Sequence, residues 1–322
     1  MRAREELVER VAMHRRSQLG TLSDAGYQEL LLAVRDDVEH FVDTPEDEAF
    51  LLVTKALERH EAACEGEDLL DDEAFFESRT KRMSRLWRDC EAALRCDPHC
   101  LDALLLRELA RDLDPDLLLG PLLEVQQTAV GLLGTHSFPA DAWEDLYLRP
   151  LLRIKGAIAR TCLDSARYRM AAEAGMEAIA LSPSDALGIR HTCELCYARL
   201  EDEQALEELD VRFSRQGSAW GHLSHTILLY KLGRMAAARR ALGGLSRLCE
   251  GGAYALLKPI MIDTYLPDRP EAAPLSLAEA TLAVHEADPI IMDVPDFVSW
   301  AQGQRDVWFS AQEFAQKNDL DW

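Results

Sequence analysis

Residues 168–190, YRMAAEAGMEAIALSPSDALGIR, decide the fold. Ala171, Gly175 and Ala178 recur at helical spacing and give the predicted helix one thin face. Such a face lets a neighbouring helix approach closely. The stretch 182–185, Ser-Pro-Ser-Asp, then ends this helix and caps the next one, because proline disfavours helical geometry in the residue before it. The sequence here therefore predicts two closely packed helices.

The same pattern recurs along the chain with a nearly constant period. Ala205 follows Ala171 by 34 residues, and Ala238 follows Ala205 by 33. Each alanine has an aromatic or apolar residue about nine positions before it, a short turn three to five positions before it and an apolar ladder after it. A sustained period of this length is typical of a solenoid of helical hairpins. The alternative, an ordinary helical bundle in which the alanines recur by chance, stays open.

The stretch from about 150 to 250 resembles the tetratricopeptide repeat family. Its small, aromatic and proline positions follow that family's order, with Pro183 and Gly217 near the unit ends. An earlier unit is suggested around Ala93 and Pro98, although Leu86 stands there where the family has a small residue. The resemblance implies an α-solenoid of antiparallel helical hairpins.

A narrower resemblance, over roughly 140 to 315, is to a group of bacterial repeat proteins, some of which carry a zinc-binding SEC-C tail. This chain lacks that cysteine-rich tail, and the resemblance implies no established activity. The positions that carry it are Trp143, Arg149-Pro150-Leu151-Leu152-Arg153, Pro183, Gly188-Ile189-Arg190, Tyr254 and Leu266-Pro267.

Helix signals dominate the whole chain, so we expect an all-α fold. Ser23-Asp24, Thr44-Pro45 and Asp71-Asp72 each place a capping side chain before an amphipathic run, and the second predicts a helix over 45–64. Strand-like alternation never persists for the length of a strand.

The expected organisation has three parts. Residues 1–80 form an N-terminal helical bundle, and residues 81–250 form the hairpins of a right-handed α-solenoid. Residues 251–322 begin with a proline-rich connection and continue as helices that cap the array, because a stacked array needs a polar outer end.

Composition limits the possible partners and compartment. The chain has 322 residues, 48% apolar content and a net charge of −22. Such acidity disfavours nucleic acid and anionic membrane surfaces. The charged opening does not resemble a signal peptide, and no apolar run reaches the length of a membrane span. We therefore expect a cytoplasmic protein whose eight cysteines stay reduced.

Aligning the repeats by their alanines predicts which side chains face the concave surface. Arginine offers paired donors to carboxylates, and aromatic rings hold a bound chain with little loss of entropy. We therefore expect a protein or peptide partner there, with an acidic or C-terminal segment. The alternative, that Arg153 and Arg190 pair internally with acids such as Asp164 and Glu194, stays open. The candidate groove residues are Arg153, Arg160, Arg190, His191, Glu194, Tyr197, Trp220 and Tyr230.

Metal and catalytic motifs are weak. Cys193 and Cys196 follow His191, and Cys96 and Cys100 flank His99, but neither pair has the second half that a zinc site needs. There is no G-x-S-x-G, H-E-x-x-H or glycine-rich phosphate loop. We expect a non-enzymatic scaffold without a cofactor. The alternative is a metal- or small-ligand-dependent enzyme with a pocket between the N-terminal helices and the concave face.

Overall fold

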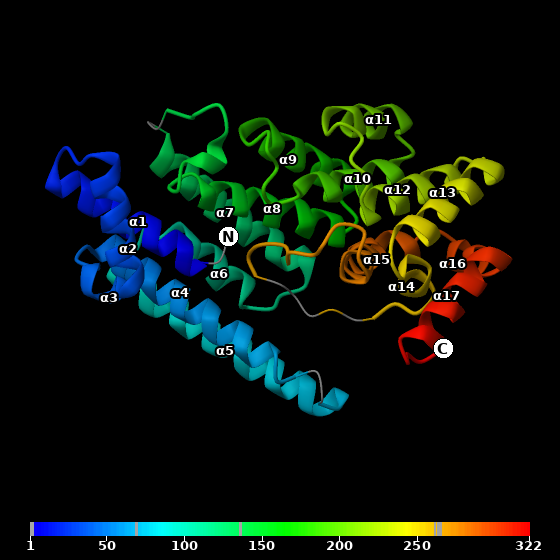
Figure 1. The fold of residues 1–322 in the computed structure, drawn as a ribbon, viewed down its shortest axis with the longest axis horizontal. Coiled ribbons are helices and arrows are strands. Elements are labelled where there is room, and N and C mark those ends of the chain that lie inside the picture. The colour runs from blue at the N-terminus through cyan, green and yellow to red at the C-terminus, as the bar shows by residue number, and fades with distance from the viewer. Residues whose placement is uncertain (1–2, 68–69, 135–136, 261, 263–265) are drawn as a thin grey trace. The chain divides into compact units, whose positions relative to one another are not determined.

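The computed structural model describes residues 3–67, 70–134, 137–260, 262 and 266–322. Every regular element within them is a helix, which confirms the all-α prediction. The chain divides into two compact units, Met1–Ile154 and Lys155–Trp322 (Figure 1). None of the described helices is both long enough and apolar enough to cross a membrane.

The helices follow one another with short connections. Those of the first unit are α1 (Ala3–Leu19), α2 (Asp24–Asp36), α3 (Val38–Phe41), α4 (Pro45–Cys64), α5 (Asp72–Cys96), α6 (Leu101–Leu109), α7 (Pro115–Leu133) and the 3-10 helix η1 (Ala142–Glu144). One helix, α8 (Arg149–Asp164), crosses the boundary between the units. Those of the second unit are α9 (Tyr168–Leu181), α10 (Ile189–Leu200), α11 (Glu203–Arg212), α12 (Ala219–Lys231), α13 (Met235–Leu248), α14 (Gly252–Leu257), α15 (Leu277–Met292), α16 (Phe297–Gln302) and α17 (Arg305–Lys317).

The predicted helix starts of the first unit are confirmed. The side chains of Ser23, Thr44 and Asp71 each accept a hydrogen bond from the backbone N–H three residues later, at 3.1, 3.1 and 2.9 Å. Each cap satisfies a donor that helix geometry leaves unpaired. The bounds of α4, Pro45–Cys64, agree with the predicted range.

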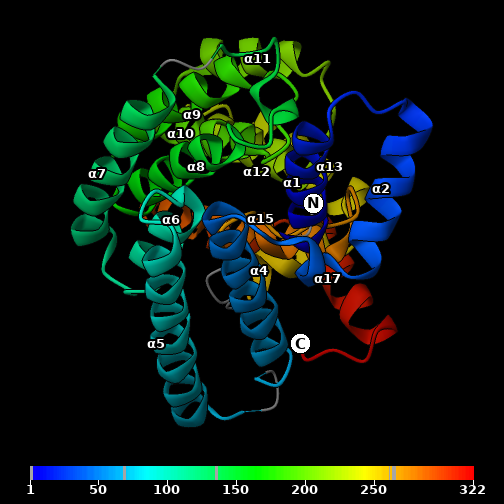
Figure 2. The same cartoon turned by 90° about the vertical axis from the view of Figure 1, so that its left-hand side faces the viewer.

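In the first unit, α4 packs along α5 to form a long hairpin (Figure 2). α1 packs against α2 and α4, and α6 packs against α5 and α7. The apolar side chains of Leu7, Leu86 and Leu105 are fully buried in these contacts. Because α5 runs without interruption from Asp72 to Cys96, no element ends at the boundary predicted between residues 80 and 81.

In the second unit, consecutive helices pack side by side. α9 packs against α10, α10 against α11 and α12, and α12 against α13. The turn predicted at 182–185 is confirmed, because α9 ends at Leu181 and the Asp185 carboxylate bonds to the first backbone N–H groups of α10. This carboxylate accepts hydrogen bonds from the backbone N–H groups of Ile189 at 2.7 Å and Arg190 at 3.2 Å.

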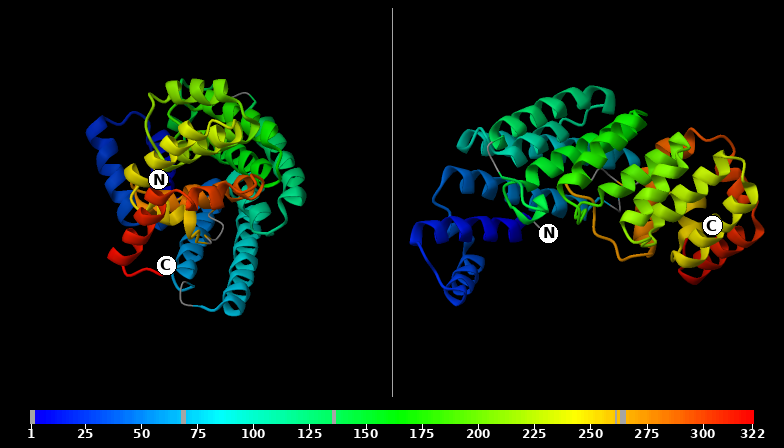
Figure 3. Two further views of the ribbon diagram at one scale, coloured as in Figure 1. Left: turned by 90° about the vertical axis from the view of Figure 1, so that its right-hand side faces the viewer. Right: turned by 90° about the horizontal axis from the view of Figure 1, so that it is seen from above.

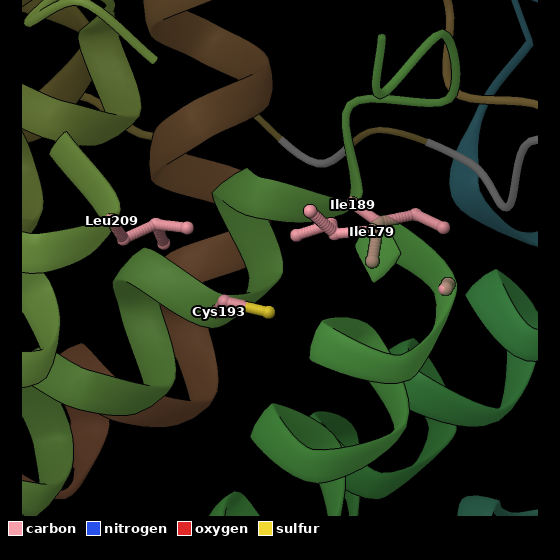
Figure 4. Packing of buried hydrophobic residues seen from close by; sticks show 5 residues of the cluster. Ile179, Ile189, Cys193 and Leu209 are labelled. Atoms are coloured by element: carbon pink, nitrogen blue, oxygen red, sulfur yellow. The ribbon is translucent and has the colours of Figure 1, made fainter. Parts of the chain in front are cut away.

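The thin face predicted for α9 is the face that packs on α10. A Cβ added at Gly175 would collide with the Sγ of Cys193, so only glycine fits this close approach. The contact continues as a buried cluster in which Ile179 and Ile189 lie next to each other (Figure 4). We name it the Ile179 cluster, and its buried members are Ala178, Ile179, Ile189, Cys193 and Leu209.

The three periodic alanines occupy corresponding places. Ala171, Ala205 and Ala238 all lie in the first turn of a helix, in α9, α11 and α13 respectively. Ala171 and Ala238 are fully buried, whereas Ala205 is only half-buried. Each repeat period of 33 or 34 residues therefore spans two helices, and the periodic alanine lies at the start of one of them.

The C-terminal helices do more than close the end of the second unit. α17 packs against α13 and α14, as a terminal layer would. α15 packs against α14 and also against α10 and α12, so this part of the chain returns alongside two helices about 60 to 90 residues earlier in the sequence (Figure 3). The compact units divide after Ile154. Near the boundary predicted between residues 250 and 251, α13 ends at Leu248 and α14 begins at Gly252.

Candidate functional site

The eight predicted groove residues are divided between the two units. Arg153 belongs to the first unit, and the other seven belong to the second. Within the second unit, four of the seven either contact the C-terminal segment, which we define as residues 266–296, or stack on a residue that does. These four are Arg160, His191, Trp220 and Tyr230. Glu194 lies against His191.

Arg153 is buried in an ion-pair network of the first unit. Its guanidinium donates to Glu6 Oε2 at 2.6 Å and to Asp102 Oδ1 at 3.1 Å. Arg10 donates to the same two carboxylates, and Arg149 Nη1 lies 3.6 Å from Glu6 Oε2. Because Arg153 is only 5% exposed, it is a structural residue and does not line an open groove.

The network decides the charge state of Glu6. Burial alone would raise the pKa of its carboxyl, but the charges of Arg153, Arg10 and Arg149 and the hydrogen bond from Arg153 outweigh burial and lower the pKa to about 2. Glu6 is therefore ionised over the whole physiological pH range. A buried carboxylate of this kind depends on its partners, because an unpaired buried charge is strongly destabilising.

His191, Glu194 and Trp220 form a buried stack between α10 and α12. The rings of His191 and Trp220 are 4.3 Å apart, with their planes 17° from parallel. His191 Nδ1 lies 3.0 Å from Glu194 Oε2. All three side chains are buried, so they hold α10 against α12 rather than facing solvent.

The C-terminal segment covers this stack with Arg269 and Glu286. Glu286 accepts hydrogen bonds from Trp220 Nε1 at 2.7 Å and from Arg269 Nε at 2.8 Å. Arg269 Nη1 donates to the Leu187 carbonyl at 3.0 Å. Gly188 has a φ of +62°, and a Cβ there would lie 2.8 Å from Arg269 Nη1, so both its backbone conformation and this close approach require glycine.

Arg160 and Tyr230 hold the two ends of the C-terminal segment by its backbone. Arg160 Nη2 donates to the Pro267 carbonyl at 3.0 Å, and the Tyr230 hydroxyl donates to the Pro295 carbonyl at 3.1 Å. A backbone carbonyl is an acceptor that every peptide carries. Two of the residues predicted to hold a partner peptide thus hold a segment of their own chain.

Arg190 and Tyr197 lie beside α9 and α11. The Arg190 guanidinium lies 4.8 Å from the centre of the Phe213 ring, and its Nε is 3.9 Å from Asp185 Oδ2. Tyr197 packs against the Ile179 cluster, and burial raises its pKa to about 12. Arg153 and Arg190 thus both have internal acidic neighbours, although these are not the Asp164 and Glu194 considered from the sequence.

Arg269 and Glu286 were not found from the sequence. Both fall in or after the proline-rich stretch, outside the three aligned units, and neither belongs to a recognisable motif. The one signal in the sequence that could have indicated them is indirect. A solenoid is expected to have a concave face, and a largely apolar helix such as α15 is suited to cover it.

The cysteines near His191 are core residues. Cys193 and Cys196 are fully buried, and burial raises the pKa of both thiols. Across the described residues, no group of three or more His, Cys, Asp and Glu side chains is placed to hold a metal ion.

No family model, no curated protein and no solved structure matches the chain.

Proposed function

We propose that the chain is a non-enzymatic, cytoplasmic protein-interaction scaffold. Its partner is a peptide segment that binds in place of the C-terminal segment, on the face formed by α10, α12 and the part of α8 that carries Arg160. The observation that carries the proposal is that Arg160 and Tyr230 donate to the backbone carbonyls of Pro267 and Pro295. Another chain offers the same acceptors, so it is able to compete for the same donors.

In this proposal the second unit is a right-handed, tetratricopeptide-like solenoid of helical hairpins. Support comes from the successive packing of α9, α10, α12 and α13. Further support comes from the matching positions of Ala171, Ala205 and Ala238 at helix starts, and from the close approach at Gly175. Small residues at repeated helix contacts are what a stacked array requires.

The segment now on this face suggests the chemistry of the partner. Two of its carboxylates accept hydrogen bonds from α12: Glu286 accepts from Trp220 Nε1, and Glu279 accepts from the Ala219 N–H at 3.1 Å. Displacing the segment would leave these donors without their acceptors, and a donor buried without an acceptor is costly. A partner with acidic side chains or a C-terminal carboxylate meets that need, as we expected from the sequence.

The experiment weakens the C-terminal segment without changing the face beneath it. Affinity capture and mass spectrometry identify the partner, and fluorescence anisotropy then measures the binding of its peptide to the full chain. Arg269→Ala removes charge-assisted hydrogen bonds to Glu286 and to the Leu187 carbonyl. Because such bonds are worth about 1.5–3 kcal/mol each, we expect the peptide to bind at least about tenfold more tightly.

Arg240→Ala is the matched control. Arg240 is exposed on α13 of the same unit, and its replacement should leave the affinity unchanged. Arg160→Ala should weaken peptide binding, because it removes a donor from the face itself. Equal affinities for wild type and the Arg269→Ala and Arg160→Ala variants would show that the partner does not use this face.

A further inference from the structure

A small pocket opens on the α4/α5 hairpin of the first unit. It has a volume of about 200 Å³. Pockets that hold drug-sized molecules have volumes of about 300–1,000 Å³, so this one is suited to a smaller ligand. Its lining includes Arg59 from α4 and Lys81, Arg82 and Arg85 from α5, with Asp89 as the one acid. The lining is thus strongly cationic in a chain whose net charge is −22.

Arg82 forms a fixed wall of this pocket. Its Nε and Nη2 donate to the two oxygens of Glu67 at 3.1 and 2.7 Å, and its Nη1 lies 3.1 Å from His60 Nε2. Because an arginine is always a donor, His60 Nε2 is the acceptor in this contact. Arg82 and Glu67 are both buried. The back of the pocket is therefore held in place before any ligand arrives.

The charges at the mouth of the pocket are less completely balanced. Arg59 pairs with Asp89 at 2.9 Å, and Lys81 pairs with Glu77 at 2.6 Å, with both members of the second pair largely exposed. Exposed pairs of this kind contribute little and exchange readily. Arg85 is exposed and makes no hydrogen bond or ion pair within the part of the chain that the structure describes.

We propose that this pocket binds the phosphate group of a small soluble anion, with Arg85, Lys81 and Arg59 as its ligands. Guanidinium groups match the geometry of phosphate oxygens. A phosphate monoester carries nearly two negative charges at neutral pH, so it balances several cations better than a single carboxylate does. The small volume and the acidity of the whole chain disfavour an extended polyanion or an anionic membrane.

The test measures binding of inorganic phosphate and of pyrophosphate to the full chain by calorimetry at low ionic strength. We expect saturable binding with one site per chain. Arg85→Ala should weaken it about tenfold or more, because it removes charge-assisted hydrogen bonds. Circular dichroism and thermal unfolding should remain as in wild type, since the Arg85 side chain makes no bond within the described chain.

Arg95→Ala is the matched control, because Arg95 is exposed on the same helix and does not line the pocket. Its affinity for both anions should equal that of wild type. The absence of saturable binding, or an equal loss in the two variants, overturns the proposal. Sedimentation with vesicles that contain phosphatidic acid separates the two sources of phosphate. Binding to these vesicles without binding to the free anions would overturn the assignment of a small soluble ligand.

Discussion

At the scale of the residue, the Glu6 network shows how far a local sequence pattern reaches. Arg153 stands at a position where the repeat alignment places a concave, partner-facing side chain. Its carboxylate partner, Glu6, is 147 residues away in the sequence. No helical period links the two residues, so their pairing could not be predicted. A guanidinium pattern in a sequence identifies the donor but not the acceptor that the fold brings to it.

Glu6→Gln should destabilise the first unit and alter its response to acid. Because the folded pKa of Glu6 is lowered from 4.5 to about 2, the contribution of its ion pairs is complete above about pH 4.5. That contribution is lost as the pH falls from 4.5 towards 2. The substitution should reduce the free energy of unfolding at neutral pH by about 3–5 kcal/mol. Denaturant titrations over this pH range measure both effects.

The control for this prediction is Glu5→Gln. Glu5 is exposed and lies next to Glu6 on α1, so its loss should change stability by less than about 0.5 kcal/mol. A Glu6→Gln variant as stable as Glu5→Gln, with the acid dependence of wild type, would mean that the buried arginines do not rely on this carboxylate.

At the scale of the element, the sequence predicted where helices begin and end better than which way they face. The caps at Thr44 and Asp185 were predictable because a cap is a contact between near neighbours in the chain. The orientation of Arg190 and Tyr197 towards α9 and α11 was not. Successive residues of a helix are about 100° apart around its axis. An error of one residue in the alignment therefore rotates the predicted face by about 100° and assigns the wrong side chains to it.

The packing of α9 on α10 gives a prediction about Gly175. A Cβ at this position would meet Cys193 Sγ, and the Cγ2 of Ile189 lies 3.3 Å from the same point. Gly175→Ala should therefore force the two helices apart and reduce the free energy of unfolding by about 1–3 kcal/mol. Urea unfolding followed by circular dichroism measures the change.

Gly131→Ala on α7 is the matched control, for which we expect a change in the free energy of unfolding of opposite sign. A Cβ at Gly131 has nothing within 4 Å, so the higher helix propensity of alanine should stabilise the chain by up to about 1 kcal/mol. If both substitutions stabilise the protein, α9 and α10 are not packed as closely as the structure indicates.

At the scale of the whole molecule, the second unit is completed by its own C-terminal segment. The period of the hairpins predicted the helices α9 to α13. It carried no information about α15, because the sequence of α15 does not continue the repeat pattern. The contacts of Arg269 with the Leu187 carbonyl and of Glu286 with Trp220 join residues 82 and 66 positions apart. The same face is therefore both a structural contact and, in our proposal, a site of exchange.

Hydrogen exchange tests whether Arg269 holds this segment in place. In Arg269→Ala, the backbone amides of α15 should exchange about tenfold faster or more than in wild type, because the opening of the segment no longer breaks charge-assisted hydrogen bonds. Within the described residues, α9 has no extensive packing against α15, so its amides should keep their protection. Arg240→Ala should leave both helices unchanged. Unaltered exchange in α15 would mean that its apolar side chains alone hold the segment. This measurement needs no partner. Faster exchange in Arg269→Ala without tighter peptide binding would mean that Arg269 holds the segment in place but that the segment does not compete with the peptide.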